Sequence, residues 1–318
     1  MDNVVEKLDE STQKRALEEL HEDIKNRDGA IETFRDWIKQ QPWLKSPIDS
    51  RFLIRFLRTK KYSQLEARKS LESYWRARSA VPEWFLNRDP SDENILKVIS
   101  KGVITLMPKT DGLGRRYILI RFGALDAGSI KTELGGVDAI YRAFFTVIDW
   151  FTMDPRVQIN GVVGIMDLTG YSLQHKMLLH SSENLKKYLG IVQSNTMRVK
   201  SMNIYNMPPV FEAVFVLIKT LLKPKLRDRV KTHGRTLVSL YNNIDMDVLP
   251  DEYLPDDHTG TSSGSLDDII GQMKEQLVKP EVVEYIRNIS KSEYGVDSKL
   301  KPSETDVPSE SFRKLNVD

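Results

Sequence analysis

The sequence contains no cysteine, which excludes disulfides, thiolate metal sites and cysteine nucleophiles. It also lacks any uninterrupted apolar run near the roughly 20 residues that a membrane-spanning helix needs. The N-terminus, MDNVVEKLDE, does not show the basic and then apolar pattern of a secretory signal. The absence of cysteine fits a reducing compartment, so together these features predict a cytoplasmic protein.

The motifs of common enzymes are missing as well. There is no Gly-x-Ser-x-Gly elbow, no P-loop lysine and no His-Glu-x-x-His pair. His175 and His180 stand five positions apart on a predicted helix, which is a poor spacing for metal ligands. Asp167 follows a buried strand, where an aspartate more often makes structural hydrogen bonds than acts as a general base. We therefore expect no enzyme activity, no catalytic residue, no metal site and no cofactor.

The sequence also has almost no excess of positive over negative charge, because the formal net charge is only +2 over 318 residues. A site for an acidic partner must therefore be local, and nucleic acid is not an expected partner. Apolar residues at 40% and charged residues at 29% suit a globular protein of one large domain or two modest ones. We expect it to act as a monomer.

Residues 1–95 are predicted to be entirely helical, because amphipathic stretches joined by short loops form an antiparallel bundle. Ser11 is expected to cap a first helix that runs through Ile24 and stops at residues 26–29. Asp49 or Ser50, and then Ser63, are expected to cap later helices. A dense set of basic residues in this part is either a solvated face or a phosphate-facing patch: Arg51, Arg55, Arg58, Lys60 and Lys61.

From residue 96 to 255, strand-like and helical patterns alternate, which predicts an α/β domain with a largely parallel sheet. The expected strands are 104–107, 117–122, 161–168, 199–205 and 229–233, with the first two joined as a hairpin. The main expected helices are 137–151 and 173–192. Residues 256–318 are expected to add one or two surface helices and, from Lys299, a mobile polar tail.

The stretch 210–222 has far more apolar surface than an ordinary surface helix. It follows two prolines, contains neither Gly nor Pro, and carries apolar residues around most of its circumference. One interpretation is a buried core helix. The other is a movable lid, with one face on an internal apolar cavity and the opposite face able to meet lipid.

Basic residues follow this helix directly and are opposed only by Asp228: Lys223, Lys225, Arg227, Arg229 and Lys231. An apolar helix beside a local basic cluster is typical of reversible binding to an anionic membrane surface. The neighbouring basic cluster therefore favours the lid interpretation.

Several motifs, taken in order over roughly residues 30–255, resemble those of the CRAL-TRIO family. They are the run 52–62, Gly114-Arg115-Arg116-Tyr117, the Asp-x-x-Gly motif within 165–172, the Ile-x-Asn-x-Pro-like run 203–208, and the closing motifs His233-Gly234 and 249–253. The chain is most similar to the tocopherol-transfer and retinaldehyde-binding branch, in an insect-like form.

The resemblance implies a CRAL-TRIO fold with an N-terminal helical domain (1–95), a lipid-binding domain (96–255) and a C-terminal helix with a tail (256–318). The sheet and its flanking helices would enclose an apolar cavity that a lid helix gates at a membrane. Candidate ligand-binding residues, each of which is otherwise plain core, are Ile118, Ile120, Phe144, Phe145, Ile148, Ile165, Ile191, Ile204, Phe211, Phe215 and Ile218.

In the tocopherol-transfer branch, basic residues beside the lid hold a phosphoinositide headgroup. The resemblance carries this role to five basic positions of this chain: Arg58, Arg198, Lys200, Lys225 and Arg229. Charge-assisted contacts from lysine and arginine to phosphate supply the physical basis.

The expected function is intracellular binding and transfer of a lipophilic small molecule of the tocopherol, retinoid or carotenoid class. The protein would dock transiently on an anionic membrane and open its lid there. Two alternatives stay open. A phospholipid-exchange protein would need polar groups deep in the cavity to hold a headgroup. An adaptor that senses phosphoinositides would carry no cargo.

Overall fold

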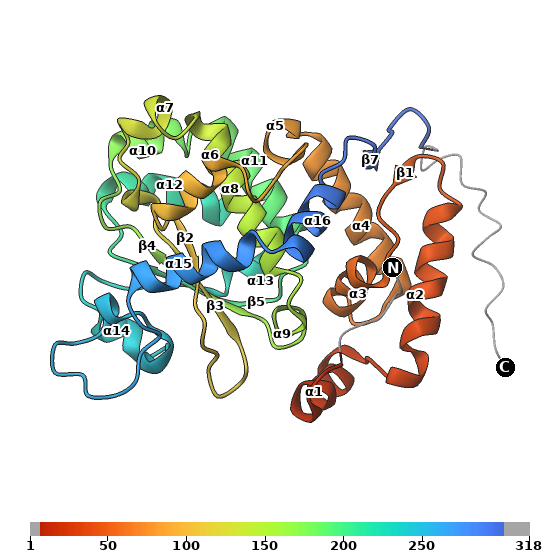
Figure 1. The fold of residues 1–318 in the computed structure, drawn as a ribbon, viewed down its shortest axis with the longest axis horizontal. Coiled ribbons are helices and arrows are strands. Elements are labelled where there is room, and N and C mark those ends of the chain that lie inside the picture. The colour runs from red at the N-terminus through yellow and green to blue at the C-terminus, as the bar shows by residue number, and fades with distance from the viewer. Residues whose placement is uncertain (1–6, 302–318) are drawn as a thin grey trace.

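A computed structural model describes residues 7–301, with a group of N-terminal helices beside a five-stranded sheet (Figure 1). The helices of the first part are α1 (Glu10–Leu20), α2 (Ile24–Lys39), α3 (Ser50–Thr59), α4 (Gln64–Ser79), α5 (Pro82–Phe85) and α6 (Glu93–Ser100). Rings of α3 and α4 pack edge to face, with Phe56 and Tyr74 5.4 Å apart between centroids. This aromatic contact holds the bundle together.

The sheet has the order β2–β3–β4–β5–β6. Its strands are β2 (Ile104–Leu106), β3 (Arg116–Ile120), β4 (Val162–Asp167), β5 (Val199–Tyr205) and β6 (Val230–Thr232). β2 and β3 form the predicted antiparallel hairpin, and all other neighbours are parallel. Every residue of β4 is buried, as a central strand covered on both faces requires. The predicted fold class, α/β with a mostly parallel sheet, is confirmed.

Helices cover both faces of this sheet. The face that carries Ile118 and Ile120 packs against α8 (Gly136–Phe151), α11 (Ser182–Ser194) and α12 (Pro209–Leu221). The opposite face packs against residues 240–254 and α15 (Leu266–Leu277), which crosses the front of the sheet in Figure 1. The remaining α-helices and strands in the described range are α7 (Ser129–Thr132), α9 (Pro155–Ile159), α10 (Leu173–Leu178), α13 (Pro224–Arg227), α14 (Val238–Tyr241), α16 (Pro280–Ile289) and the small pair β1 (Leu44–Lys45) and β7 (Gly295–Val296).

Two predicted helices differ from the structure, each being split in two, and the cap of α1 differs as well. The first predicted helix is in fact two, because His21 adopts a left-handed backbone (φ 62°) after α1 and Asp23 caps a new helix. Asp9, rather than Ser11, caps α1. The predicted helix 173–192 is also split, because Ser181 accepts a hydrogen bond from the backbone N–H of Asn184 and starts α11 anew.

A buried network of charged residues joins three parts of the chain. Asp149 of α8 accepts hydrogen bonds from Arg78 of α4 (2.5 and 2.8 Å) and from Arg88 (2.6 Å). Arg55 of α3 donates to the hydroxyl of Tyr285 on α16 (3.0 Å). Because the three arginines and Asp149 are almost fully buried, the N-terminal helices, α8 and α16 are held together by charged hydrogen bonds as well as by packing. We call this set the arginine network.

Aromatic rings compensate the excess positive charge of this network. The guanidinium of Arg55 lies 4.2 Å from the ring centroid of Phe52, and that of Arg78 lies 4.0 Å from the ring centroid of Tyr74. Cation–π contacts are strongest when desolvated, so they offset part of the cost of burying three arginines with one aspartate.

Candidate functional site

A largely enclosed apolar cavity of about 50 Å³ lies between the sheet and helices α8 and α11. Five of the predicted ligand-binding residues line it together: Ile118, Ile120, Phe144, Phe145 and Ile148. The rest of its wall is Val162, Gly164, Tyr188, Val192, Asn195, Met197, Val199 and Met202. The structure thus brings together residues from one strand, β3, and one helix, α8, that the sequence predicted as one site.

The other predicted ligand-binding residues do not reach this wall. Ile191, Ile204, Phe211 and Phe215 are buried in the same apolar core, and Ile218 packs partly against it. Ile165 was predicted to line the ligand cavity, but the structure places it elsewhere. Its side chain lies on the opposite face of the sheet, in the cluster that contains Tyr117, Leu119 and Val163, because neighbouring residues of a strand point to opposite faces.

The cavity is contracted in this structure. Sites that enclose small lipophilic molecules have volumes of about 300–1,000 Å³, several times what is present here. Met202 fills much of the space, since a Cβ atom added at Gly164 would lie 2.5 Å from its Cε. Methionine side chains rearrange easily, so Met197 and Met202 are the wall residues most able to make room.

Polar groups on the cavity wall are few. Among its wall residues in the described range 7–301, only Tyr188 and Asn195 have side chains that can donate a hydrogen bond. Tyr188 is a buried residue, and within residues 7–301 no hydrogen bond is found for its hydroxyl. Burial raises the pKa of Tyr188, so the hydroxyl stays protonated and can donate. The wall therefore suits a mainly apolar molecule with a small polar group.

The inner face of α12 packs against protein. Phe211 is fully buried and meets the rings of Tyr171 and His180 edge to face, at 5.2 and 5.9 Å between centroids. Burial lowers the pKa of His180 to about 3, with a smaller effect of His175, so His180 is neutral at physiological pH. Its Nδ1 lies 2.9 Å from the Tyr171 hydroxyl. The structure is therefore a closed state in which α12 seals the apolar core.

The outer face of α12 exposes apolar side chains beside Glu212 and Lys219. Val216 is 63% exposed and Leu221 38%. On α10, which contacts α12, Leu173 is 59% and Met177 67% exposed. Leu173 and Met177 are not among the residues predicted from the sequence, although their four-residue spacing on a helix indicates one shared face. Four apolar side chains on two contacting helices thus lie open to solvent.

The predicted basic residues have different surroundings. Arg58 was predicted to contact a phosphoinositide headgroup, but its side chain is only 1% exposed and cannot reach a headgroup in this structure. Its guanidinium donates to both carboxylate oxygens of Glu22 (2.7 and 2.8 Å) and to Gln158 (2.7 Å). Removing either partner would leave a buried charge unpaired, so this pair is structural.

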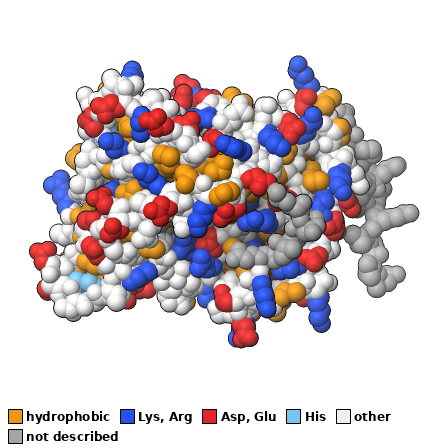
Figure 2. Space-filling model, in the orientation of Figure 1, with side chains coloured by type: hydrophobic (Ala, Val, Ile, Leu, Met, Phe, Trp, Pro, Cys, Tyr) orange, Lys and Arg blue, Asp and Glu red, His pale blue; other side chains and the backbone are white. Residues whose placement is uncertain are grey.

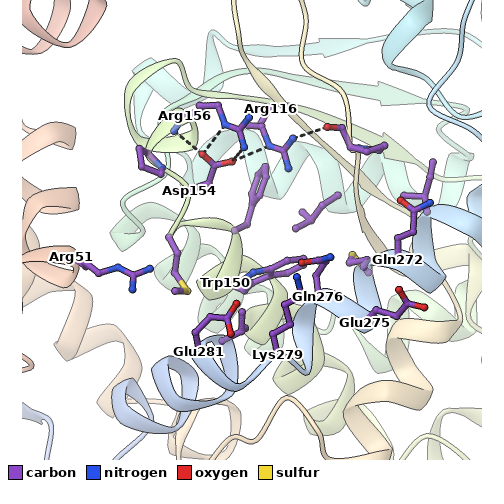
Figure 3. A pocket seen from close by; sticks show the side chains of 18 residues that line it. Arg51, Arg116, Trp150, Asp154, Arg156, Gln272, Glu275, Gln276, Lys279 and Glu281 are labelled. Carbon is purple, nitrogen blue, oxygen red and sulfur yellow. Dashed lines mark hydrogen bonds and ion pairs between the residues drawn. The ribbon is translucent and has the colours of Figure 1, made fainter. Parts of the chain in front are cut away.

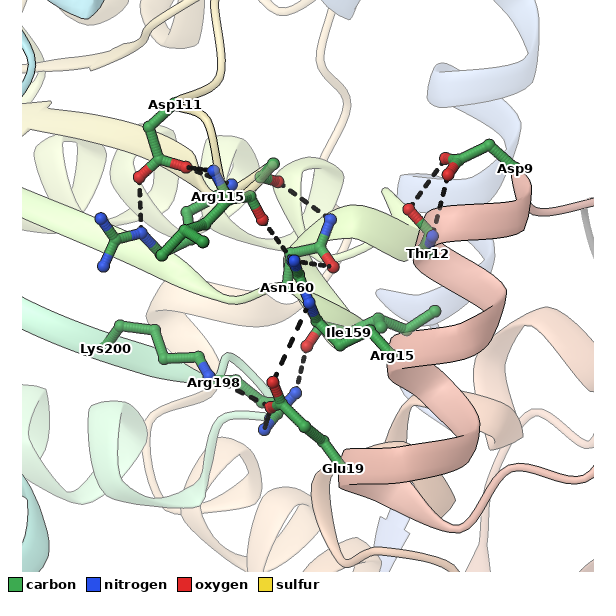
Figure 4. A network of polar contacts seen from close by, with 12 residues as sticks. Asp9, Thr12, Arg15, Glu19, Asp111, Arg115, Ile159, Asn160, Arg198 and Lys200 are labelled. Atoms are coloured by element: carbon green, nitrogen blue, oxygen red, sulfur yellow. Dashed lines mark hydrogen bonds and ion pairs between the residues drawn. The ribbon is translucent and has the colours of Figure 1, made fainter.

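Arg198 and Lys200 are partly covered by helix α1. Both donate to Glu19, at 3.0 and 3.3 Å (Figure 4). Burial alone would raise the pKa of Glu19, but Arg198 and Lys200 outweigh burial and lower it. By contrast, Lys225 and Arg229 have no carboxylate partner in the described part of the chain, and Arg229 donates to the backbone carbonyl of Val199.

Two larger clefts flank α15 and α16 but have the wrong chemistry for an apolar ligand. The one between α15 and the β3–α9 region measures about 680 Å³. Figure 3 shows Trp150 in its centre, surrounded by charged side chains: Arg51, Arg116, Arg156, Lys279, Asp154, Glu275 and Glu281. Acidic and basic side chains are mixed across this whole face (Figure 2). An apolar molecule would have to desolvate those charges, so the apolar cavity is the better ligand site.

The fold and the cavity define a class of protein, an α/β protein built around an internal apolar site. Comparison with known families agrees. The CRAL/TRIO domain model matches residues 100–253, and the model of the Pinta-like UBA domain matches residues 23–95. Alpha-tocopherol transfer protein-like of Mus musculus is 32% identical over 262 residues, which cover 82% of this chain and 72% of the relative. The chain belongs to the CRAL/TRIO family.

Other relatives are similar over nearly the same span. Clavesin-1 of Pongo abelii is 30% identical over 267 residues, covering 81% of this chain and 73% of the relative. The crystal structure of Sfh5 aligns with a TM-score of 0.47 at 15% identity, over 86% of this chain and 99% of that chain.

Family membership fixes the general character of the protein. It belongs to a family that binds and transfers lipophilic ligands, and its tocopherol-transfer-like and clavesin relatives are non-enzymatic binding proteins. Within residues 7–301 no helix is long and apolar enough to cross a membrane.

Proposed function

We propose that this protein carries a lipophilic small molecule and exchanges it at an anionic, phosphoinositide-containing membrane. The observation that carries the proposal is the exposed apolar surface of α10 and α12, which covers the apolar core and runs directly into a basic segment. An exposed apolar patch next to basic residues is what a reversibly membrane-bound protein presents. We call Leu173, Met177, Val216 and Leu221 the apolar patch.

Membrane contact supplies the free energy to open the closed state. Fully burying one Leu, Val or Met side chain gains about 1.5–3 kcal/mol. The apolar patch has four such side chains, each only partly exposed now, so insertion gains several kcal/mol. If opening costs a few kcal/mol in solution, a membrane that binds the open form more tightly by a similar free energy shifts the equilibrium toward the open form. Docking and opening are thereby coupled.

The cavity chemistry favours a small lipophile over a phospholipid. A phospholipid headgroup would need charged or several polar partners, whereas the cavity wall has only Tyr188 and Asn195. We therefore propose cargo of the tocopherol, retinoid or carotenoid kind. The relative from Mus musculus has alpha-tocopherol transfer in its name, which points to the same class.

Extraction of the purified protein tests the proposal directly. Organic extraction followed by mass spectrometry and absorbance should recover one apolar molecule per chain at most, and a polyene would absorb visibly. Recovery of a phospholipid instead would favour phospholipid exchange. If no ligand is extracted and none of the candidate lipophiles moves between vesicles, the adaptor alternative would replace the carrier.

Replacing Lys225 and Arg229 together by Ala is expected to weaken binding to phosphoinositide vesicles by about tenfold or more. Each cation near an anionic surface contributes about 1 kcal/mol. Ligand uptake in detergent should not change, because neither residue lines the cavity. Vesicle co-sedimentation measures the effect. The matched control removes two exposed lysines beside α6 and α16, Lys101→Ala and Lys279→Ala. Equal vesicle binding by the parent, the double variant and the control would mean that Lys225 and Arg229 do not contribute to membrane docking.

Replacing Leu173, Met177 and Val216 by Ser is expected to slow ligand transfer between vesicles by at least tenfold, since the loss of apolar burial weakens docking and opening. Stability should hardly change, because the three side chains are exposed. A fluorescent lipophile passed between donor and acceptor vesicles reports the rate. As a control, the exposed Leu17, Leu65 and Leu113 can be replaced by Ser on other elements. Transfer at the parent rate would contradict a role for the apolar patch.

A further inference from the structure

The ring of Tyr188 is held in place by aromatic side chains of α8. Its centroid lies 5.9 Å from that of Tyr141, 5.8 Å from that of Phe144 and 5.9 Å from that of Phe145. Because closely packed rings leave one another little freedom, the direction of the Tyr188 hydroxyl is set by its neighbours. Phe144, Phe145 and Tyr188 all line the apolar cavity, so this hydroxyl belongs to a rigid part of the wall.

The Tyr188 hydroxyl is a donor that finds no acceptor among residues 7–301. Although the residue is buried, the hydroxyl oxygen keeps some accessible surface. A buried donor that makes no hydrogen bond costs free energy, and folded proteins keep few of them. Once an apolar chain fills the cavity and displaces water, the acceptor for this donor has to come from the cargo.

Tyr141 belongs to the same aromatic cluster but has a different role. Its hydroxyl donates to the backbone carbonyl of Leu179 at 2.6 Å, so the protein itself satisfies this donor. Tyr141 also does not line the cavity. Of these two tyrosines, Tyr188 is therefore the one whose hydroxyl is left for a ligand.

Asn195, the other polar residue of the wall, is less suited to select a ligand. Its Oδ1 accepts a hydrogen bond from the backbone N–H of Met197 (2.9 Å), and the residue is only half-buried. A half-buried amide can bond to water instead, so a contact with cargo gains little. Asn195 follows Tyr188 by seven positions, which is about 10 Å along a helix, so one ligand oxygen cannot reach both.

The cavity wall also restricts the charge of the ligand. None of its residues in the described part of the chain carries a charged side chain. An ionised carboxylate would have to leave water without a cation to pair with, which is unfavourable in an apolar site. A hydroxyl or carbonyl oxygen has no such cost and can accept the hydrogen bond of Tyr188.

We propose that Tyr188 selects the cargo by donating a hydrogen bond to an uncharged oxygen atom of a lipophilic alcohol, phenol or aldehyde. This inference rests on the proposed carrier function and narrows its substrate class. A hydrocarbon of the same shape leaves the Tyr188 hydroxyl unpaired, and an ionised acid brings an unpaired charge into the cavity. The oxygenated end of the cargo lies among the rings of α8 rather than at the end of α11.

The test compares the binding of three retinoids of similar shape to the parent and to Tyr188→Phe. They are retinol, retinoic acid and axerophthene, the hydrocarbon in which hydrogen replaces the hydroxyl of retinol. Displacement of one fluorescent lipophile in detergent gives each dissociation constant. Tyr188→Phe should weaken retinol binding about fivefold, as expected for one hydrogen bond, and leave axerophthene binding within about twofold. At about pH 8 the parent should bind retinoic acid at least about tenfold more weakly than retinol.

Tyr141→Phe is the matched control, because it removes a hydroxyl from the same aromatic cluster. The Leu179 carbonyl then loses its donor, so this variant should melt at a lower temperature than the parent. The ratio of its dissociation constants for retinol and axerophthene should nevertheless equal that of the parent. Tyr188→Phe breaks no hydrogen bond within residues 7–301, so its thermal unfolding should resemble that of the parent.

The outcomes separate this inference from the proposed function. If Tyr188→Phe changes the binding of retinol and axerophthene by the same factor, the hydroxyl does not contact the cargo and the inference is wrong. If Asn195→Val weakens retinol selectively and Tyr188→Phe does not, the oxygen lies at the end of α11 and the inference is wrong as well. If the parent binds none of the three retinoids and moves no lipophile between vesicles, the proposed function itself fails.

Discussion

Asp149→Asn is expected to lower the melting temperature by on the order of 10 °C. The substitution keeps the shape of the side chain but removes the only carboxylate within residues 7–301 that binds Arg78 and Arg88. Breaking a buried charge pair by removing one partner costs about 3–5 kcal/mol, because the remaining charge stays buried without compensation. In a chain of this size, each kcal/mol corresponds to about 2–4 °C. Thermal unfolding followed by circular dichroism measures the change.

The same network predicts how stability depends on pH. Burial acts to raise the pKa of Asp149, but Arg78 and Arg88 outweigh burial and lower it from 3.8 to about 2. A carboxylate with a lowered folded-state pKa stabilises the protein fully above its unfolded pKa, and this stabilisation is lost as pH falls through the folded one. The parent should therefore lose stability between about pH 4 and 2, and Asp149→Asn should lose less of it over that range.

The control for Asp149→Asn is Asp228→Asn. Asp228 is exposed and lies 4.0 Å from Arg227, so its loss should change the free energy of unfolding by less than about 0.5 kcal/mol. If both variants melt within a degree or two of the parent, the arginine network does not stabilise the fold as argued.

Gly164→Leu is expected to abolish uptake of a lipophilic ligand. Gly164 lies on β4 at the cavity wall, and a side chain there displaces Met202 into the remaining space. The clash is with the flexible end of Met202 and with no backbone atom, so the variant should fold with only a modest loss of stability. Fluorescence titration with a retinoid or tocopherol analogue should show binding weakened by at least about 100-fold.

A matched glycine lies outside the cavity. Gly190 is an exposed residue of α11, and a Cβ atom added there would meet nothing within 4 Å. Gly190→Leu should bind ligand as the parent does. Unchanged uptake by Gly164→Leu would mean that the ligand occupies another part of the apolar core, and the space behind Phe211 and Phe215 would be the next place to test.

The architecture was predictable because it follows from local patterns. The alternation of strands and helices, the hairpin before β3 and the caps at Asp49 and Ser63 are all encoded within a few neighbouring residues. Ile118 and Ile120 could be assigned to one wall because residues two apart on a strand share a face.

The errors arise where the answer depends on distant partners. β4 is apolar at nearly every position, so its sequence does not indicate which residues point toward the cavity, and Ile165 was assigned to the wrong face. The surroundings of Arg58 depend on Glu22, which lies in the segment between α1 and α2. No local pattern around Arg58 distinguishes a buried ion pair from an exposed phosphate site.

The arginine network also limits which parts of the protein can move during exchange. A hinge motion between the N-terminal helices and the sheet would separate the arginines from their aromatic neighbours and leave Asp149 without its ion-pair partners. Each broken pair would cost several kcal/mol. If cargo is exchanged as proposed, we therefore expect the movement that admits it to be confined to α10–α12, Met197 and Met202, while the rest of the fold stays rigid. A fragment that begins after residue 95 would lack Arg55, Arg78 and Arg88, and would not have this rigidity.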